Sequence, residues 1–122
     1  MTTKFVQNGN VVNYTAGADI AAGDVVVMGH TIGVALTAIA NGATGAVAIE
    51  GVFTVPKVSA AVFTVGEKLI FDVSATPPAF DDSAATPASG DITGGAVAMV
   101  AGENAQTTCV VKLTPGNATK TA

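Results

Sequence analysis

Apolar and polar side chains alternate along residues 45–57, near the middle of the chain. A period of two is typical of a β-strand with one buried face. Gly51 interrupts the apolar face, which predicts a bulge or a close approach by another backbone, and Pro56 should end the strand or place it at an edge. The pattern therefore predicts one half-buried strand, whose core positions are Val47, Ile49, Gly51, Phe53 and Val55.

Other short runs of β-branched and aromatic residues lie between turn signals, and helical periodicity is absent. The pair Gly29-His30 fits the turn of a two-residue hairpin. Several short strands at short intervals indicate an all-β sandwich or barrel, with at most one short helical turn near residues 59–62. The further predicted strands are residues 11–15, 25–28, 31–38, 68–73, 96–100 and 108–113.

The chain divides into one domain with two short extensions. Residues 1–7 form an N-terminal arm, residues 8–114 form a single small β domain, and residues 115–122 read as a polar, frayed tail. Within the domain, residues 74–93 are rich in Pro, Ala and Ser, and we expect a long loop or a loose hairpin there.

Two parts of the chain resemble each other. Residues 22–27 are similar to residues 65–70, since each has a Gly followed by an acidic residue before an apolar run. Farther along, residues 33–35 are similar to residues 94–96. Either the two halves share an architecture, or two unrelated hairpins use the same turn chemistry.

Composition indicates a protein that works in an assembly. Of its 122 residues, 49% are hydrophobic but only 5% aromatic and 11% charged. Soluble domains usually carry roughly 25% charged residues, so this surface is poorly protected against self-association. A small soluble monomer with an Ala-rich surface is the alternative.

Charge and hydropathy make several partners unexpected. The net charge is −4, and the five basic residues are scattered lysines, so we expect no nucleic-acid partner. Residues 25–49 lack charge but are interrupted by Gly, Asn and Thr, which favours two buried strands over a membrane span. Residues 1–9 lack the apolar core of a signal peptide, so we expect synthesis in a cytoplasm without export by the general route.

Residues that could carry chemistry are few. His30 fits a turn, and Cys109 alternates with apolar residues, as a buried structural cysteine does. Asp81 and Asp82 could hold Ca²⁺ with their neighbours, but the spacing of an EF-hand is missing and a solvated loop is favoured. The turn at residues 42–45 lacks the lysine of a phosphate-binding loop. We therefore predict no enzyme, no catalytic residue, no cofactor and no metal site.

Several blocks of sequence, in order and at matching intervals, resemble a family of phage and prophage capsid cement proteins, also called head-decoration proteins and formerly a domain of unknown function. The resemblance covers roughly residues 4–73 and is weaker in the last third, where residues 74–90 are Pro-rich. The blocks are residues 8–15, 18–27, 32–35 and 45–53, followed by Pro56-Lys57 and by the second Gly-acid turn at residues 65–69.

The resemblance implies a β-clip or tulip-like fold of the lambdoid head-decoration type. It also implies homotrimers on the outside of a virion, the major capsid protein as partner, synthesis in the cytoplasm of a bacterial host and no catalytic residues. Such a protein would stabilise the expanded shell. We expect the arm before the first turn to contact the capsid by adding a strand to an open sheet edge. Its residues are Thr2, Thr3, Lys4, Phe5, Val6 and Gln7.

Two other functions remain open from the sequence. The loop at residues 74–90 could display a glycan-binding site of a phage or cell-surface adhesion module, although Phe80 is its one aromatic residue. A small enzyme or a metabolite-binding barrel would need chemistry that the motifs do not supply.

Overall fold

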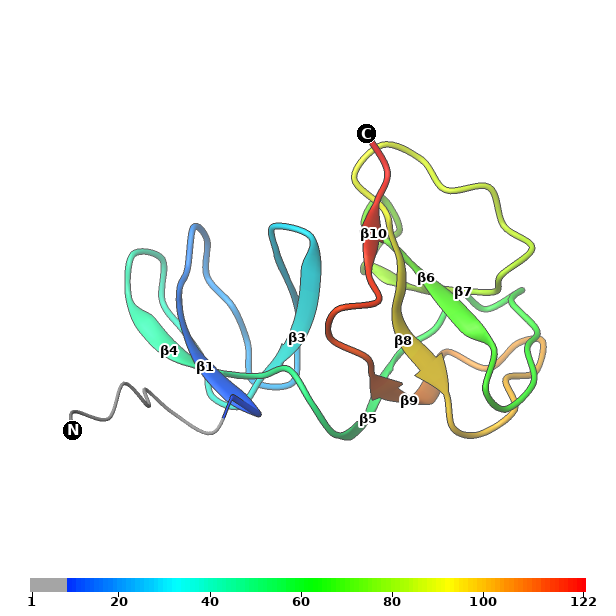
Figure 1. The fold of residues 1–122 in the computed structure, drawn as a ribbon, viewed down its shortest axis with the longest axis horizontal. Helices are drawn as coiled ribbons and strands as arrows, with labels where there is room; N and C mark the ends of the chain where they lie inside the picture. Colours follow the sequence, from blue (N-terminus) through cyan, green and yellow to red (C-terminus); the bar gives the residue numbers. More distant parts are fainter. Residues whose placement is uncertain (1–8) are drawn as a thin grey trace, which may run out of the picture.

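The computed structural model describes residues 9–122, which contain ten β-strands and no helix, so the all-β prediction is confirmed. Figure 1 shows the first sheet, in blue to cyan, beside the second, in green to red. The strands are β1 (Val11–Thr15), β2 (Val25–Met28), β3 (Thr31–Ala35), β4 (Thr44–Ala48), β5 (Val52–Pro56), β6 (Lys68–Asp72), β7 (Ala79–Asp81), β8 (Ile92–Ala98), β9 (Thr108–Leu113) and β10 (Thr119–Lys120).

The strands form two antiparallel sheets. The first has the order β1-β4-β3-β2, and the second has the order β5-β9-β8-β6-β7, with β10 added to β8. The predicted hairpin at Gly29-His30 is confirmed: Met28 pairs with Thr31, and Gly29 has a φ of 64°. The predicted helical turn is a single hydrogen-bonded turn, in which Ala61 N–H donates to Val58 O.

The prediction of one strand along residues 45–57 is wrong. Strand β4 ends at Ala48 in the first sheet, and β5 begins at Val52 in the second. Gly51 lies in the crossover with a φ of 123°, a conformation that side chains other than Gly rarely adopt. The alternation of apolar residues continues across the crossover because both strands bury one face, each in its own sheet.

The Pro-rich segment is more ordered than predicted. Strand β7 pairs antiparallel with β6, and Phe80 is fully buried with its ring centroid 5.0 Å from that of Phe71. Phe80 also forms a parallel bridge with Lys57 just after β5, so the second sheet curls back toward its first strand. The expectation of a long loop at residues 74–93 missed this strand, because Phe80 is its only large apolar side chain.

The prediction of a frayed tail is also wrong. Strand β10 pairs with β8, and Gly90 N–H and Thr121 N–H form hydrogen bonds that tie the C-terminal segment to the end of the Pro-rich segment. Asp91 is buried there, and its carboxylate accepts from Val73 N–H and Ala88 N–H.

The molecule has two groups of buried apolar residues. The larger lies within the second sheet and includes Ile32 and Val34 of β3, so the first sheet packs against the second. Ile32 lies against Gly95 of β8: a Cβ at Gly95 would come within 2.9 Å of it. The smaller group lies inside the first sheet and consists of Ala16, Val26, Ala35, Ile39 and Val47.

The similarity between the two halves reflects a structural repeat. We call the part of the chain with β1–β4 the first unit and the part with β5–β10 the second unit. In the first unit, Gly23 N–H donates to Ala35 O over 2.8 Å, and Ala35 N–H donates to Asp24 O. In the second, Gly66 N–H donates to Ala98 O over 2.7 Å, and Ala98 N–H donates to Glu67 O. The acidic side chains act alike, since Asp24 accepts from Ala21 N–H and Glu67 from Thr64 N–H.

The repeat extends to whole strands. In strand pairing, β1, β2, β3 and β4 of the first unit correspond to β5, β6, β8 and β9 of the second. Ala35 pairs with Val47 as Ala98 pairs with Val111. The sequence match of residues 33–35 with 94–96 was out of register by two, because Ala35 corresponds to Ala98 and the β6–β8 pairing contains a register shift. Among the residues that the structure describes, strands β7 and β10 have no counterpart in the first unit.

Candidate functional site

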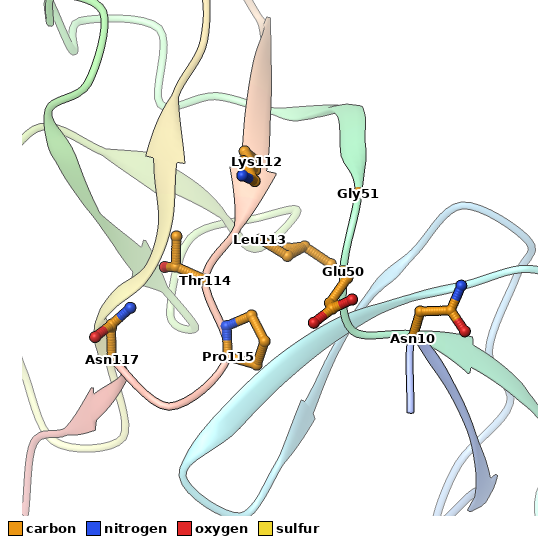
Figure 2. A pocket seen from close by; sticks show the side chains of 8 residues that line it. All are labelled: Asn10, Glu50, Gly51, Lys112, Leu113, Thr114, Pro115 and Asn117. Atoms are coloured by element: carbon orange, nitrogen blue, oxygen red, sulfur yellow. The ribbon is translucent and has the colours of Figure 1, made fainter. Parts of the chain in front are cut away.

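A pocket of about 620 Å³ lies at the crossover between the two sheets. Figure 2 shows Asn10 and Glu50 on one wall and Thr114, Pro115 and Asn117 on the other. Backbone hydrogen bonds fix this geometry: Ile49 N–H donates to Asn10 O, and Leu113 N–H donates to Gly51 O, both over 3.0 Å. The complete lining is Asn10, Glu50, Gly51, Lys112, Leu113, Thr114, Pro115 and Asn117.

The chemistry of this pocket is limited. Its lining contains one carboxylate, Glu50, and one ammonium group, Lys112, but no imidazole and no thiol. The hydroxyl of Thr114 donates to Gly94 O over 2.8 Å, so it is engaged in holding β8. General acid-base or nucleophilic catalysis needs paired groups within hydrogen-bond reach, and the contacts in this pocket do not provide such a pair.

A second groove, of about 340 Å³, lies in the first unit between the end of β1 and strand β2. It is lined by Tyr14 of β1, by residues 17–20 after that strand, and by Asp24 and residues 25–27 of β2. A groove beside the edge of a β-strand suits an extended peptide, which can pair with the backbone of that strand.

Lys57 is the residue whose role sequence reasoning missed. Its side chain is only 4% exposed, and its ammonium group donates to three carbonyls, those of Val58, Ser59 and Gln106, over 2.9, 3.1 and 3.3 Å. A buried charge of this kind is tolerated because hydrogen bonds replace its hydration. The signal available in the sequence was its position directly after Pro56 in an apolar strand.

Cys109 is buried in β9, in agreement with its predicted structural role. Burial raises the pKa of its thiol to about 11, although the nearby Lys57 charge acts in the opposite direction. A thiol with so high a pKa is a poor nucleophile at neutral pH, because the thiolate is the reactive form.

The acidic residues around Asp81 and Asp82 that were considered for Ca²⁺ serve as hydrogen-bond acceptors for backbone N–H and hydroxyl groups. Asp72 accepts from the backbone N–H and the hydroxyl of Ser74, and Asp82 accepts from Ala84 N–H and, over 3.4 Å, from Val62 N–H. In residues 9–122, no group of three or more His, Cys, Asp or Glu side chains is placed to hold a metal ion.

The core positions predicted for residues 45–57 are divided between the two sheets. Val47 is buried in the smaller core and Val55 in the larger one. Phe53 is half-buried and packs against the larger core, Ile49 is half-buried in the crossover, and Gly51 lines the pocket at the crossover. The arm residues Thr2, Thr3, Lys4, Phe5, Val6 and Gln7 lie outside the described residues.

Exposed apolar side chains gather on two neighbouring turns of the second unit. Val62, Val65 and Val100 are 57%, 60% and 55% exposed, and Met99 is 38% exposed. The turns are joined by the hydrogen bond from Gly66 N–H to Ala98 O and by the bridge between Phe63 and Gly102. We call Val62, Val65, Met99 and Val100 the apolar turn patch.

Two curled antiparallel sheets, an apolar turn patch and pockets without paired reactive groups are the features of a small all-β structural module. Comparison with known families matches residues 6–113 to the phage cement protein family, and the chain belongs to that family. Its class is therefore that of phage capsid structural proteins. No curated protein matched the chain in a sequence search. Within residues 9–122, no helix is long and apolar enough to cross a membrane.

Proposed function

We propose that this protein is a decoration protein that binds the outside of an expanded phage head as a homotrimer and stabilises it against internal pressure. The observation that carries the proposal is the family match over residues 6–113. The proposal includes a β-clip or tulip-like relationship to lambdoid head-decoration proteins, the major capsid protein as partner, and synthesis in the bacterial cytoplasm before assembly on the virion.

The apolar turn patch supports binding through apolar contacts. Three valines more than half exposed on adjoining turns are costly for a free monomer but favourable at an interface. The equivalent turns of the first unit have Ala22 in place of Val65 and Leu36, 46% exposed, in place of Met99, so the first unit exposes fewer large apolar side chains there. The surface of the second unit is therefore the better candidate for contact with the shell or with another copy.

The arm is proposed to contribute to attachment. Residues 2–7 contain Thr, Phe and Val, which favour extended structure. Removing these residues should lower the occupancy of the shell and its resistance to heat. Shells that are equally occupied and equally heat-resistant with the shortened chain would contradict this role.

The function is tested by mass spectrometry of purified particles. A decoration protein should be present in numbers close to those of the major shell protein, and adding it to undecorated expanded shells should raise their unfolding temperature. A matched pair of variants tests the surface: Val65→Ser should reduce occupancy, whereas Ala22→Ser, at the equivalent turn, should not. Absence of the chain from particles would refute the proposal.

The alternative adhesion function loses its main support in the structure. Glycan-binding sites usually present aromatic side chains on their surface, but Phe80 of β7 is fully buried and its ring packs against that of Phe71 in β6. Binding on a glycan array combined with absence from shells would nevertheless favour that alternative.

A further inference from the structure

Strand β7 fills a position in the second unit for which residues 9–122 supply no strand in the first unit. In the second unit, β7 lies between β6 and the chain just after β5, pairing with β6 and bridging Lys57. In the first unit, the corresponding segments are β2 and the chain just after β1, and they line the 340 Å³ groove. The groove is thus the first unit's counterpart of the β7 position.

The backbone beside the groove is arranged to accept a strand. Asp24 O accepts from Ala35 N–H of β3. Val26 and Met28, two and four residues farther along, lie opposite Gly33 and Thr31 and so belong to the same hydrogen-bonded set of pairs. Because hydrogen-bonding residues alternate along an antiparallel pair, the N–H and C=O groups of Val25 and Val27 face away from β3, toward the free edge. Strand β2 therefore presents an open ladder beside the groove.

The opposite wall has an equivalent donor. In the second unit, Lys57 N–H donates to Thr107 O, and the next residue, Val58, donates its N–H to Phe80 O over 2.9 Å. In the first unit, Ala16 N–H donates to Ala43 O, and the next residue is Gly17, which lines the groove. The N–H of Gly17 has no backbone acceptor within residues 9–122.

We propose that this groove binds the N-terminal arm of a second copy of the chain as an added β-strand. The proposal deepens the proposed function. It rests on that function only in requiring that two copies of the chain lie side by side. In this arrangement Phe5 occupies the position that Phe80 has in the second unit, opposite Met28, and its carbonyl accepts from Gly17 N–H. A Met side chain is a favourable neighbour for an aromatic ring.

Composition and net charge favour the arm as the occupant. Strand β7 places an aromatic side chain, Phe80, between β6 and the chain after β5. The arm likewise contains an aromatic residue, Phe5, followed by the β-branched Val6. Its one charged residue is the basic Lys4, whereas the charged side chains that line the groove, Asp19 and Asp24, are acidic.

Chain direction assigns the arm to a different copy. Strand β7 runs antiparallel to β6 and parallel to the chain at Lys57. An arm with this direction would leave the groove near Ala16 and would have to return to Asn10. These two residues are about 20 Å apart, because six residues of extended chain separate them. The three peptide units between Gln7 and Asn10 span only about 10 Å, so the molecule's own arm is too short.

Disulfide trapping between two full-length variants tests the proposal. One chain carries Val6→Cys and a mass tag, and the other carries Val27→Cys. These positions correspond to Asp81 and Ile70 of the second unit, which lie opposite each other in the β6–β7 pair. The two are mixed at high concentration and on expanded shells, and then mildly oxidised. A mixed dimer should form, and it should be lost when Phe5→Ala is added to the first chain. Val52→Cys, on an exposed residue of β5, is the matched control for the second chain.

The outcomes separate the alternatives. Mixed dimers at Val27 that exceed those at Val52 and depend on Phe5 support the proposal. Equal trapping at both positions, trapping that is unchanged by Phe5→Ala, or no trapping in either setting would overturn it. A chain with both cysteines that closes on itself at all dilutions would assign the groove to its own arm and also overturn it. Trapping in free protein that does not decorate shells would reject the proposed function while leaving this inference intact.

Discussion

At the scale of single residues, Gly51 controls the passage of the chain from one sheet to the other. Its φ of 123° excludes most side chains, and a Cβ would come within 3.1 Å of the Phe53 ring. Gly51→Val should destabilise the fold by about 1–3 kcal/mol through backbone strain, with crowding against Phe53 in addition. Urea unfolding followed by circular dichroism measures the change.

The control for Gly51 is Gly116→Ala. Gly116 also has a positive φ, 89°, but a Cβ there would meet no atom within 4 Å, so it reports the backbone cost alone. A Gly51→Val protein as stable as the parent would show that the crossover does not require glycine.

Cys109 provides an internal probe of unfolding. At pH 8 a thiol with a pKa of about 11 is almost entirely protonated, and the side chain is also buried. An unperturbed thiol has a pKa of about 8.5. We expect Ellman's reagent to react with Cys109 slowly in the folded protein and rapidly in denaturant. The comparison is Val65→Cys in a Cys109→Ala background, where the thiol is exposed; equal rates at the two positions would contradict the burial of Cys109.

At the scale of elements, Glu67 joins a turn to the Pro-rich segment. The N–H and hydroxyl of Ser83 and the N–H of Thr64 hold the pKa of Glu67 below its ordinary value. A lowered pKa means that this carboxylate stabilises the fold above the unfolded pKa of about 4.3, and that the contribution is lost as pH falls through the lower folded pKa.

Glu67→Gln should therefore lower stability at neutral pH and flatten its decline in acid. Chemical unfolding from pH 7 to pH 3 measures both effects. Glu103→Gln, on an exposed turn, controls for the loss of one negative charge. Parallel curves for the parent and Glu67→Gln proteins, displaced by a constant amount, would rule out the linkage.

Most strands were predictable from the sequence because their signals are local. The strand at residues 11–15 was predicted with the bounds that it has in the structure, and the hairpin was predicted with its turn at Gly29-His30. The crossover at Gly51 was not predictable from periodicity, since alternation does not show which sheet a strand joins. Strand β7 was missed because three residues among prolines carry little pattern, and its pairing with β6, across the connection that contains Pro77 and Pro78, shows only in three dimensions.

The candidate site was less predictable than the fold. The absence of recognisable motifs led to the expectation of no enzyme, and the resemblance identified the family that the comparison shows. Two features depended on three-dimensional pairing: the three carbonyls around the Lys57 ammonium group and the groove beside β2. The repeated Gly-acid turns at Gly23 and Gly66 were visible, but only their matching hydrogen bonds distinguish a repeat from ordinary turn chemistry.

At the scale of the whole molecule, the repeat makes the two units internal controls for each other. The first unit has the smaller core, and within residues 9–122 no strand covers the outer edge of β2, whereas β7 covers the corresponding edge of β6. Backbone N–H groups without a partner exchange with solvent readily, while those in a covered ladder exchange through opening of the structure.

Amide hydrogen exchange should therefore distinguish equivalent positions in one sample of dilute protein. Gly17 N–H should exchange rapidly, and its counterpart, Val58 N–H, slowly because it donates to Phe80 O. Within β2, the amide of Val27 should exchange faster than that of Val26, which pairs with Gly33 of β3. Equal protection at Gly17 and Val58 in dilute protein would mean that the groove is already filled within one molecule, whereas protection of Gly17 that rises with concentration would indicate that a second copy fills it.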